Sequence, residues 1–389
     1  MGTFVIIDMI TMRILNHFLF FFAVSFSLLS CGQKNPEIIL PGQDAMRPND
    51  VIINLPSAVK GLTANWFQNG EPMGEMIGLG DNSFAATVSP YADNVTIEVN
   101  GSKGKPVKYE VDLKGCLDVQ AHRGGAGLMP ENTIEAMENA VRLGVNTLEL
   151  DLHLSSDGVV VVSHDHFFSW RYCTNPDGSE IKEGDPLDYL YKHTYEEIEK
   201  YDTGLKPHPW FPDQQKIATH KPRAYDLIKD IEDLTAREGR SPMRYNIEVK
   251  SDAEEGEGVN WPDYKTLCDK CAELFHQFDL GDRLVIQCFD VRSLNYMHEK
   301  YPEFRYSYLI ETKGEPWESF MGKLDFKPDW LSPEDCLVTQ EMVDRCHAEG
   351  IKIVPWNPDD PVEMQKQIDM GIDALITNRP DILLGITRK

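Results

Sequence analysis

From Cys116 to the end of the chain, strand-like apolar segments alternate with helix-like segments. The predicted strands cover 117–121, 146–152, 244–249, 284–289, 305–310, 329–332, 351–356 and 374–377. The predicted helices cover 134–143, 223–237, 263–277, 291–300, 317–323, 339–348, 361–369 and 381–386. Eight strands, each followed by a helix, is the count of a TIM (β/α)8 barrel, and we expect this α/β fold for residues 115–389. A doubly wound sheet is the alternative, but no glycine-rich dinucleotide-binding loop follows the first strand.

Residues 166–220 interrupt this alternation. The segment is rich in aromatic residues, proline and aspartate, and only 195–201 has a helical pattern. Long loops in compact domains usually carry functional surfaces. We therefore expect an insertion that lies over the mouth of the barrel and shapes the substrate pocket.

The chain before the barrel has a different pattern. Between residues 50 and 111, short alternating runs are separated by turn signals, among them Asn69-Gly70 and Asn100-Gly101. Asn-Gly pairs favour the tight turns of β-hairpins. Residues 32–114 are therefore predicted to hold a linker and a small all-β, sandwich-like domain, which we interpret as a spacer.

Residues 1–31 have the pattern of a targeting signal. Met12 and Arg13 begin a short basic region, and an apolar run covers 14–29. This run is short for a transmembrane helix and has the proportions of a secretory signal peptide. It ends at Cys31, in a sequence that resembles a bacterial lipobox. We expect cleavage before Cys31, lipidation of its sulfur and a lipid-anchored protein of the bacterial cell envelope, periplasmic or surface-facing. An ordinary signal peptide with a chance cysteine is the alternative.

The net charge and the cysteines of the chain exclude some functions and types of site. The formal net charge of -25 argues against nucleic-acid binding, which needs a basic surface. An anionic substrate must therefore meet a local cation, either a metal ion or a placed Arg or Lys. The cysteines after Cys31 are scattered and odd in number, unlike a disulfide framework. Cys268 and Cys271 form a C-x-x-C pair with no second pair to complete a zinc site, and we expect them to be buried.

Carboxylates stand at the ends of two predicted strands. Glu149 and Asp151 end the second strand and Glu248 ends the third. The reactive groups of a TIM barrel lie at the carboxyl ends of its strands, so we expect these three to point toward one region. Together they would repel one another and raise one another's pKa values. A hard divalent cation, Ca²⁺ or Mg²⁺, resolves this repulsion because it prefers oxygen ligands.

Two histidines and two permanent cations accompany the carboxylates. His122 and Arg123 directly follow the first predicted strand, and Lys250 follows Glu248 at a spacing of two. His164 follows a hairpin signal that should fold back beside the second strand. Histidine is the natural proton-transfer group near neutral pH, and two of them allow one to act as base and the other as acid.

These motifs resemble the glycerophosphodiester phosphodiesterase family. The resemblance covers about 116–386 and rests on a specific opening block, an inner motif and a closing motif. The opening block is His122-Arg123-Gly124, Pro130-Glu131-Asn132-Thr133, Leu148-Glu149-Leu150-Asp151, Asp157-Gly158-Val159 and His164-Asp165. The inner motif is Asn246-Ile247-Glu248-Val249-Lys250, and the closing motif is Gly371-Ile372-Asp373-Ala374-Leu375-Ile376-Thr377-Asn378-Arg379-Pro380.

The resemblance implies a TIM barrel that hydrolyses a small-molecule glycerophosphodiester to glycerol 3-phosphate and an alcohol. It places the acid/base pair on His122 and His164 and the phosphate-binding cations on Arg123 and Lys250. It assigns the three carboxylates to one divalent cation and Trp356 to the substrate pocket. The nucleophile is either water or the substrate's own 2-hydroxyl.

The chain departs from the family pattern beside this pocket. Asn357-Pro358-Asp359 replaces a Thr-containing continuation after Trp356, and Asn378 stands where Asp is common. We expect these departures to bear on the alcohol and to leave the chemistry intact.

Two other functions fit part of the sequence. A barrel phosphodiesterase of phospholipase C or D type would act on intact phospholipids. A lipid anchor favours this alternative, whereas the acidic chain with its polar insertion disfavours it. A surface lipoprotein that binds a ligand through its β-domain would leave the intact set of seven site residues unexplained.

Overall fold

The computed structural model describes residues 35–56, 61–80, 82–101, 105–253 and 256–388, so the predicted signal and Cys31 lie outside the described residues. Eight parallel strands form a nearly closed barrel in the order β16-β15-β14-β13-β12-β10-β9-β17, and single bridges from Trp356 to Glu334 and Ile376 join the two edges. The strands are β9 (Asp118–Ala121), β10 (Thr147–Leu154), β12 (Arg244–Val249), β13 (Leu284–Cys288), β14 (Arg305–Ile310), β15 (Trp330–Pro333), β16 (Lys352–Ile353) and β17 (Ala374–Thr377). The predicted TIM-type barrel is confirmed.

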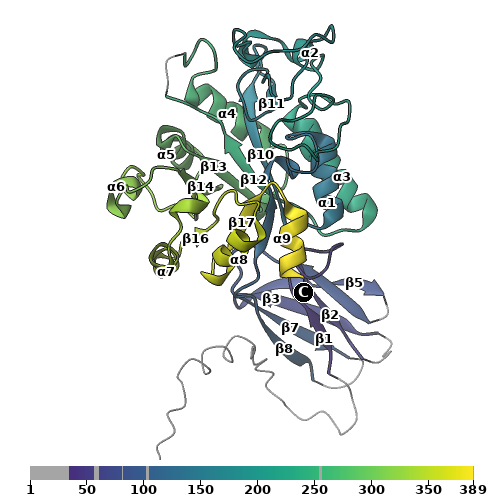
Figure 1. Ribbon diagram of the computed structural model, residues 1–389. Coiled ribbons are helices and arrows are strands. Elements are labelled where there is room, and N and C mark those ends of the chain that lie inside the picture. The colour runs from purple at the N-terminus through teal and green to yellow at the C-terminus, as the bar shows by residue number, and fades with distance from the viewer. Residues whose placement is uncertain (1–34, 57–60, 81, 102–104, 254–255, 389) are drawn as a thin grey trace, which may run out of the picture.

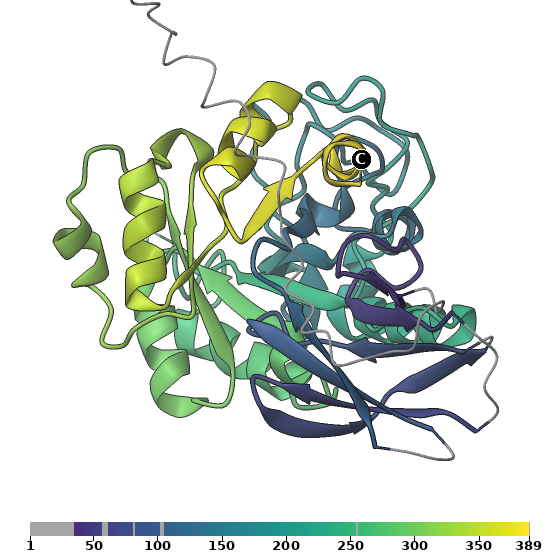
Figure 2. The same ribbon diagram turned by 90° about the horizontal axis from the view of Figure 1, so that it is seen from below.

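Helices surround the strands on the outside (Figures 1 and 2). They are α1 (Ile134–Leu143), α3 (Ala224–Glu238), α4 (Tyr264–Phe275), α5 (Val291–Lys300), α6 (Trp317–Met321), α7 (Gln340–Glu349), α8 (Pro361–Asp369) and α9 (Pro380–Thr387). Short 3-10 turns are η1 (His122–Gly124), η2 (Leu190–Lys192), η3 (Gly281–Arg283) and η4 (Asp335–Leu337). No helix of the described ranges is long and apolar enough to cross a membrane.

The insertion lies at the carboxyl-terminal end of the barrel. β11 (Val160–Val162) pairs antiparallel with β10 and turns the chain back toward the barrel mouth, as the hairpin signal predicted. From there the chain is mostly irregular, with one short helix, α2 (Tyr195–Ile198). Its aromatic side chains have a core of their own, which includes Phe168, Tyr172 and Tyr195.

Residues 37–112 form the predicted all-β region. One antiparallel sheet has the order β1-β2-β6-β5 and the other β4-β3-β7-β8. The strands are β1 (Glu37–Ile39), β2 (Asp50–Asn54), β3 (Thr63–Gln68), β4 (Glu71–Glu75), β5 (Ile77–Gly80), β6 (Ser83–Thr87), β7 (Asn94–Asn100) and β8 (Val107–Asp112). Residues such as Ile53 and Ile97 are fully buried in a core separate from that of the barrel.

The β region covers the amino-terminal end of the barrel, opposite the insertion (Figure 1). Arg244, the first residue of β12, donates to Asp118 Oδ2 at 3.1 Å and to the Val88 carbonyl at 3.0 Å. At β15, the Trp330 indole N–H donates to the Tyr91 hydroxyl at 2.8 Å. These contacts fix the β region to the amino-terminal ends of the barrel strands. The carboxyl-terminal ends of the strands remain available for a functional site.

Candidate active site

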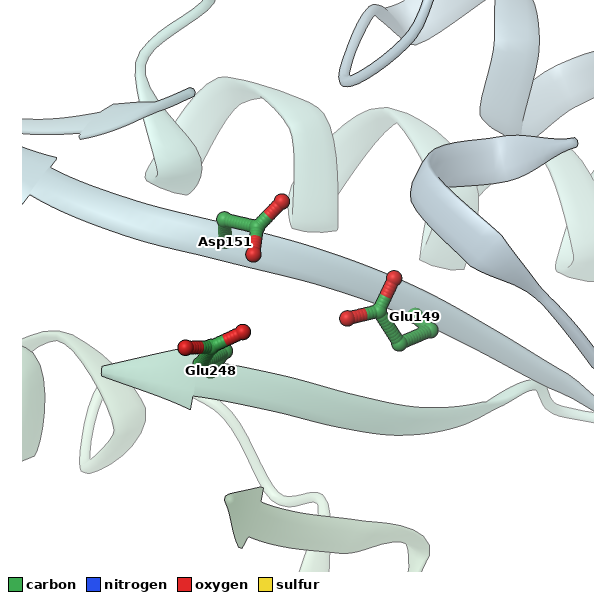
Figure 3. A group of neighbouring side chains, drawn as sticks. All are labelled: Glu149, Asp151 and Glu248. Carbon is green, nitrogen blue, oxygen red and sulfur yellow. The ribbon is translucent and has the colours of Figure 1, made fainter. Parts of the chain in front are cut away.

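Three buried carboxylates lie together at the carboxyl end of two neighbouring strands. Glu149 and Asp151 alternate with leucines along β10, so the leucines pack under the helices while the carboxylates point into the barrel. Glu248 lies on β12, opposite Asp151 in the parallel register. One oxygen of each side chain lies within 4.8 Å of the other two, and Figure 3 shows the three groups facing one another. The predicted cluster is therefore assembled.

Burial has a strong effect on these carboxylates. Burial, with the charge of Asp151, raises the pKa of Glu149 well above its usual value. Burial also raises the pKa of Glu248 to about 7, although Lys250 acts in the opposite direction. For Asp151, burial acts to raise the pKa, but His164 and further positive neighbours outweigh it, so the pKa is lowered. Two of the three groups thus favour protonation unless a further positive charge is present.

The donor atoms fit a hard divalent cation. All atoms of the group are carboxylate oxygens, which Ca²⁺ and Mg²⁺ prefer. Asp151 Oδ1 is buried without a hydrogen-bond partner among the described residues, and Lys250 Nζ lies 4.0 Å from it. A cation held by the three side chains would satisfy this oxygen and remove the repulsion.

Arg123 is held in the site by an unusual backbone conformation. It lies in η1 with a φ of 51°, and its backbone N–H donates to Glu149 Oε2 at 2.8 Å. The guanidinium donates to Glu131 Oε1 at 3.0 Å and lies 3.5 Å from Asp151 Oδ2. The turn needs Gly124 next to it, because a Cβ there would lie 2.7 Å from the Cβ of Ala136.

Lys250 follows β12 and lies beside the carboxylates. Its Nζ lies 2.9 Å from Glu248 Oε1, and burial, which lowers the pKa of the ammonium, is outweighed by Glu248 and Asp151, so the pKa is raised. Arg123 and Lys250 therefore both remain charged beside the cation site, as a phosphate-binding role requires.

His164 is oriented by a carboxylate. Its Nδ1 lies 2.8 Å from Asp165 Oδ1, and Arg171 contacts the other oxygen of Asp165 at 3.4 Å. Burial, together with Arg123, lowers the pKa of His164, while the hydrogen bond to Asp165 raises it. The nearby His153 donates from Nε2 to the His164 backbone carbonyl at 3.0 Å, which fits a structural role.

His122 is oriented by amides instead. Its Nδ1 lies 2.6 Å from Asn378 Oδ1 and 3.0 Å from Asn357 Nδ2. Burial, with the charge of Arg123, lowers the pKa of His122 to about 3. The ring is thus held without its own carboxylate partner among the described residues.

One pocket of about 260 Å³ joins these groups. The predicted site residues that line it are His122, Arg123, Glu149, His164, Glu248, Lys250 and Trp356. Asp151 is buried and belongs to the same carboxylate group as the lining residues Glu149 and Glu248. Phe289 packs edge-to-face on Trp356 at 5.6 Å between ring centroids and forms an apolar wall with Leu309. Glu311 is exposed at the same pocket and has no ion-pair partner among the described residues.

Sequence reasoning missed several residues that hold the site. Asn132 is of a residue type that often caps helices, but Thr133 is the residue that caps α1, at the Ala136 N–H. Asn132 instead has a φ of 57° and donates to Asp151 Oδ2 at 2.8 Å. Gln287 on β13 donates to Glu149 Oε1 at 2.8 Å, and the available signal was a polar residue in an otherwise apolar strand.

The cysteines of the described chain do not form a disulfide framework, as their scattered positions predicted. All seven from Cys116 onward are free, and Cys268 and Cys271 are buried in the barrel core.

Comparisons with known proteins identify the barrel. Residues 122–382 match the glycerophosphoryl diester phosphodiesterase family. A glycerophosphodiester phosphodiesterase of Caldanaerobacter subterraneus is 29% identical over 273 residues, which cover 70% of this chain and 98% of the relative. One from Bacillus altitudinis is 25% identical over 261 residues, 67% of this chain and 94% of the relative.

Solved structures show the same fold. A phosphodiesterase of Oleispira antarctica, in complex with the product sn-glycerol-3-phosphate, superposes with a TM-score of 0.54 at 23% identity, covering 70% of this chain and 97% of that one. A glycerophosphodiester phosphodiesterase of Parabacteroides distasonis gives 0.51 at 21%, covering 70% and 96%. The chain belongs to the glycerophosphoryl diester phosphodiesterase family, whose reaction is the hydrolysis of glycerophosphodiesters.

Proposed function

We propose that this protein hydrolyses glycerophosphodiesters to glycerol 3-phosphate and an alcohol with one divalent cation, Ca²⁺ or Mg²⁺, and with His122 and His164 as the proton-transfer pair. The observation that carries the proposal is one pocket lined by both histidines and both cationic side chains, with the three-carboxylate group at its base. The product complex of the Oleispira relative supports the same substrate class.

Each part of the pocket has a separate task. The cation, when bound by Glu149, Asp151 and Glu248, would supply Lewis-acid stabilisation of the phosphate. Arg123 and Lys250 neutralise the charge that develops on the phosphoryl oxygens. One histidine accepts a proton from the nucleophile, which is either water or the substrate's 2-hydroxyl. The other histidine donates a proton to the leaving alcohol.

The lipid anchor at Cys31 is part of the same proposal. The apolar run followed by cysteine supports it, and the anchor would hold the enzyme at the cell envelope. Labelling with a fatty-acid analogue, compared between the parent and Cys31→Ser, tests this part independently of catalysis.

The direct test is release of glycerol 3-phosphate from a panel of the choline, ethanolamine, glycerol and inositol diesters, with and without chelator. We expect release that chelation abolishes and added Ca²⁺ or Mg²⁺ restores. His122→Ala should lower kcat by roughly 10²–10⁴. A lysophospholipid in the same panel tests the lipid alternative. No release from any glycerophosphodiester with metal present would contradict the proposal, as would parent activity in His122→Ala.

A further inference from the structure

A short chain of hydrogen bonds lies behind His122, on the loops that follow β16 and β17. Asp359 Oδ2 accepts from Asn378 Nδ2 at 3.0 Å. Asp359 Oδ1 accepts from the Asn378 backbone N–H at 3.0 Å and from the Thr377 hydroxyl at 3.0 Å. The other end of the same amide, Asn378 Oδ1, lies 2.6 Å from His122 Nδ1. Asn378 is buried, with 6% of its surface exposed.

These contacts fix the direction of the Asn378 amide. A carboxylate only accepts hydrogen bonds, so the NH₂ end of the amide must face Asp359. The oxygen end must then face His122, and an amide oxygen also only accepts. The hydrogen between them therefore belongs to His122 Nδ1. A neutral imidazole that carries its hydrogen on Nδ1 has a lone pair on Nε2.

The second amide at His122 does not oppose this assignment. Asn357 Nδ2 lies 3.0 Å from His122 Nδ1, and the Asn357 side chain has no other hydrogen-bond partner in the described chain. Which end of an amide faces a neighbour is assigned from its hydrogen bonds. Since Asp359 fixes Asn378 and nothing fixes Asn357, Asn357 is the amide that turns its oxygen toward the ring.

His164 has the same contact at Nδ1, but its partner is charged. The Asp165 carboxylate lies 2.8 Å from Nδ1 and acts to raise the pKa of the ring, although burial and Arg123 lower that pKa overall. The amide behind His122 carries no charge of this kind. The charged and titratable groups that face His122 are Arg123, Asp151 and His164.

We propose that Asp359 and Asn378 are positioning residues that hold His122 in the Nδ1–H tautomer and so keep the Nε2 lone pair of its neutral ring available for proton transfer. This inference rests on the proposed function. One proton is taken from the attacking hydroxyl as the new P–O bond forms. One proton is given to the alcohol oxygen as the old P–O bond breaks, so protons and charges balance.

An exchange of the two side chains tests the proposal. Asn378→Asp places two carboxylates against each other, and Asp359→Asn frees the amide to turn. Each single variant should lower kcat by about 10–100-fold with KM nearly unchanged, the usual effect of removing a group that orients a reacting side chain. The double variant Asp359→Asn/Asn378→Asp restores one donor and one carboxylate, and its kcat should recover to within about fivefold of the parent.

The double variant also has a signature that a merely structural role would not produce. Its carboxylate lies directly against His122, which favours the imidazolium, so the acid limb of the kcat/KM profile should move to higher pH. Asp369→Asn, on the neighbouring α8, is the matched carboxylate control, and thermal unfolding shows whether each variant is folded. Losses in the double variant that equal the product of the single losses would overturn the proposal, as would single variants with parent kcat.

Nitrogen-15 NMR of labelled histidine reads the tautomer without any reaction. The parent should show His122 with a protonated Nδ1, and a spectrum with a protonated Nε2 would overturn the assignment. If the parent hydrolyses no glycerophosphodiester but shows this tautomer, the failure lies with the proposed function and not with the positioning of His122.

Discussion

At the amino-terminal end of the barrel the buried Asp118 is matched by Arg244 and Thr147, whereas at the carboxyl-terminal end three buried carboxylates face one another. The first group is complete within the protein and joins the barrel to the β region. The second has an unsatisfied oxygen on Asp151 and raised pKa values on Glu149 and Glu248. A buried carboxylate that is paired within the protein indicates a structural role. A group of buried carboxylates without enough positive partners, in a pocket, indicates a site for a ligand.

The largest effect is expected when one negative charge is removed from the carboxylate group at the carboxyl-terminal end of the barrel. Glu248→Gln should lower kcat/KM by about 10³, because a bound cation contributes several kcal/mol to stabilisation of the transition state. Stability of the cation-free protein should not fall, because burial and Asp151 disfavour the Glu248 charge more than the ion pair with Lys250 favours it. Glycerol 3-phosphate release and urea unfolding measure the two effects, with the exposed Glu299→Gln as control. Parent activity in Glu248→Gln would contradict a catalytic cation site at this end of the barrel.

A change at the amino-terminal end of the barrel should instead lower stability and leave activity nearly unchanged. Arg244→Met leaves Asp118 buried without its cation, which should lower the free energy of unfolding by about 3–5 kcal/mol. Below its unfolding temperature the variant should keep kcat within about twofold, because the strand starts lie away from the pocket. A large loss of kcat in a stable Arg244→Met protein would show that the two ends are coupled.

Cation binding should depend on pH at the carboxyl-terminal end of the barrel. The Glu248 carboxyl, with a pKa raised by burial to about 7, must lose its proton to bind a cation. Affinity should therefore rise with pH up to about 7 and beyond, by about tenfold per pH unit for each of Glu248 and Glu149 that is still protonated. Calorimetry in two buffers of different ionisation enthalpy would detect the released proton. Binding that is independent of pH between 5.5 and 7 would contradict this picture.

The same pKa sets the pH dependence of the cation-free protein. The folded state keeps a proton on Glu248 that the unfolded chain loses near the usual pKa of 4.5. This group therefore lowers stability as pH rises from 4.5 through about 7. Added cation should raise the unfolding temperature more at pH 8 than at pH 6.

The smallest effect should come from the rim of the pocket. Glu311 is exposed and lies on the side of the aromatic wall, where an ammonium group of the substrate alcohol would meet its charge. Glu311→Gln should lower kcat/KM for the choline diester about threefold to fivefold relative to the glycerol diester, the range of an exposed ion pair. Equal changes for both substrates would exclude Glu311 from alcohol selection.

Local patterns were enough to predict much of the molecule. The alternation of strands and helices gives the barrel, and the spacing of two between Glu149 and Asp151 gives two inward carboxylates on one strand. The hairpin signal before His164 likewise predicted its return to the mouth. These features depend on residues close together in the sequence.

The residues that orient the site could not be found in this way. Asn132 has the residue type and place of a helix cap, and only the left-handed turn beside Arg123 brings it to Asp151. Asn378 and His122 are 256 residues apart, and closure of the barrel between β17 and β9 brings them together. Such contacts depend on the assembled fold and leave no local pattern.

The position of the β region also decides which way the pocket faces. β1, near the start of the described chain, belongs to the region fixed to the strand starts, so the chain enters the molecule at the end opposite the pocket. A tether at Cys31 would hold that end toward the bilayer and turn the pocket toward the aqueous phase. In this orientation the pocket would face away from the bilayer. It would then receive water-soluble substrates more readily than lipids of the membrane.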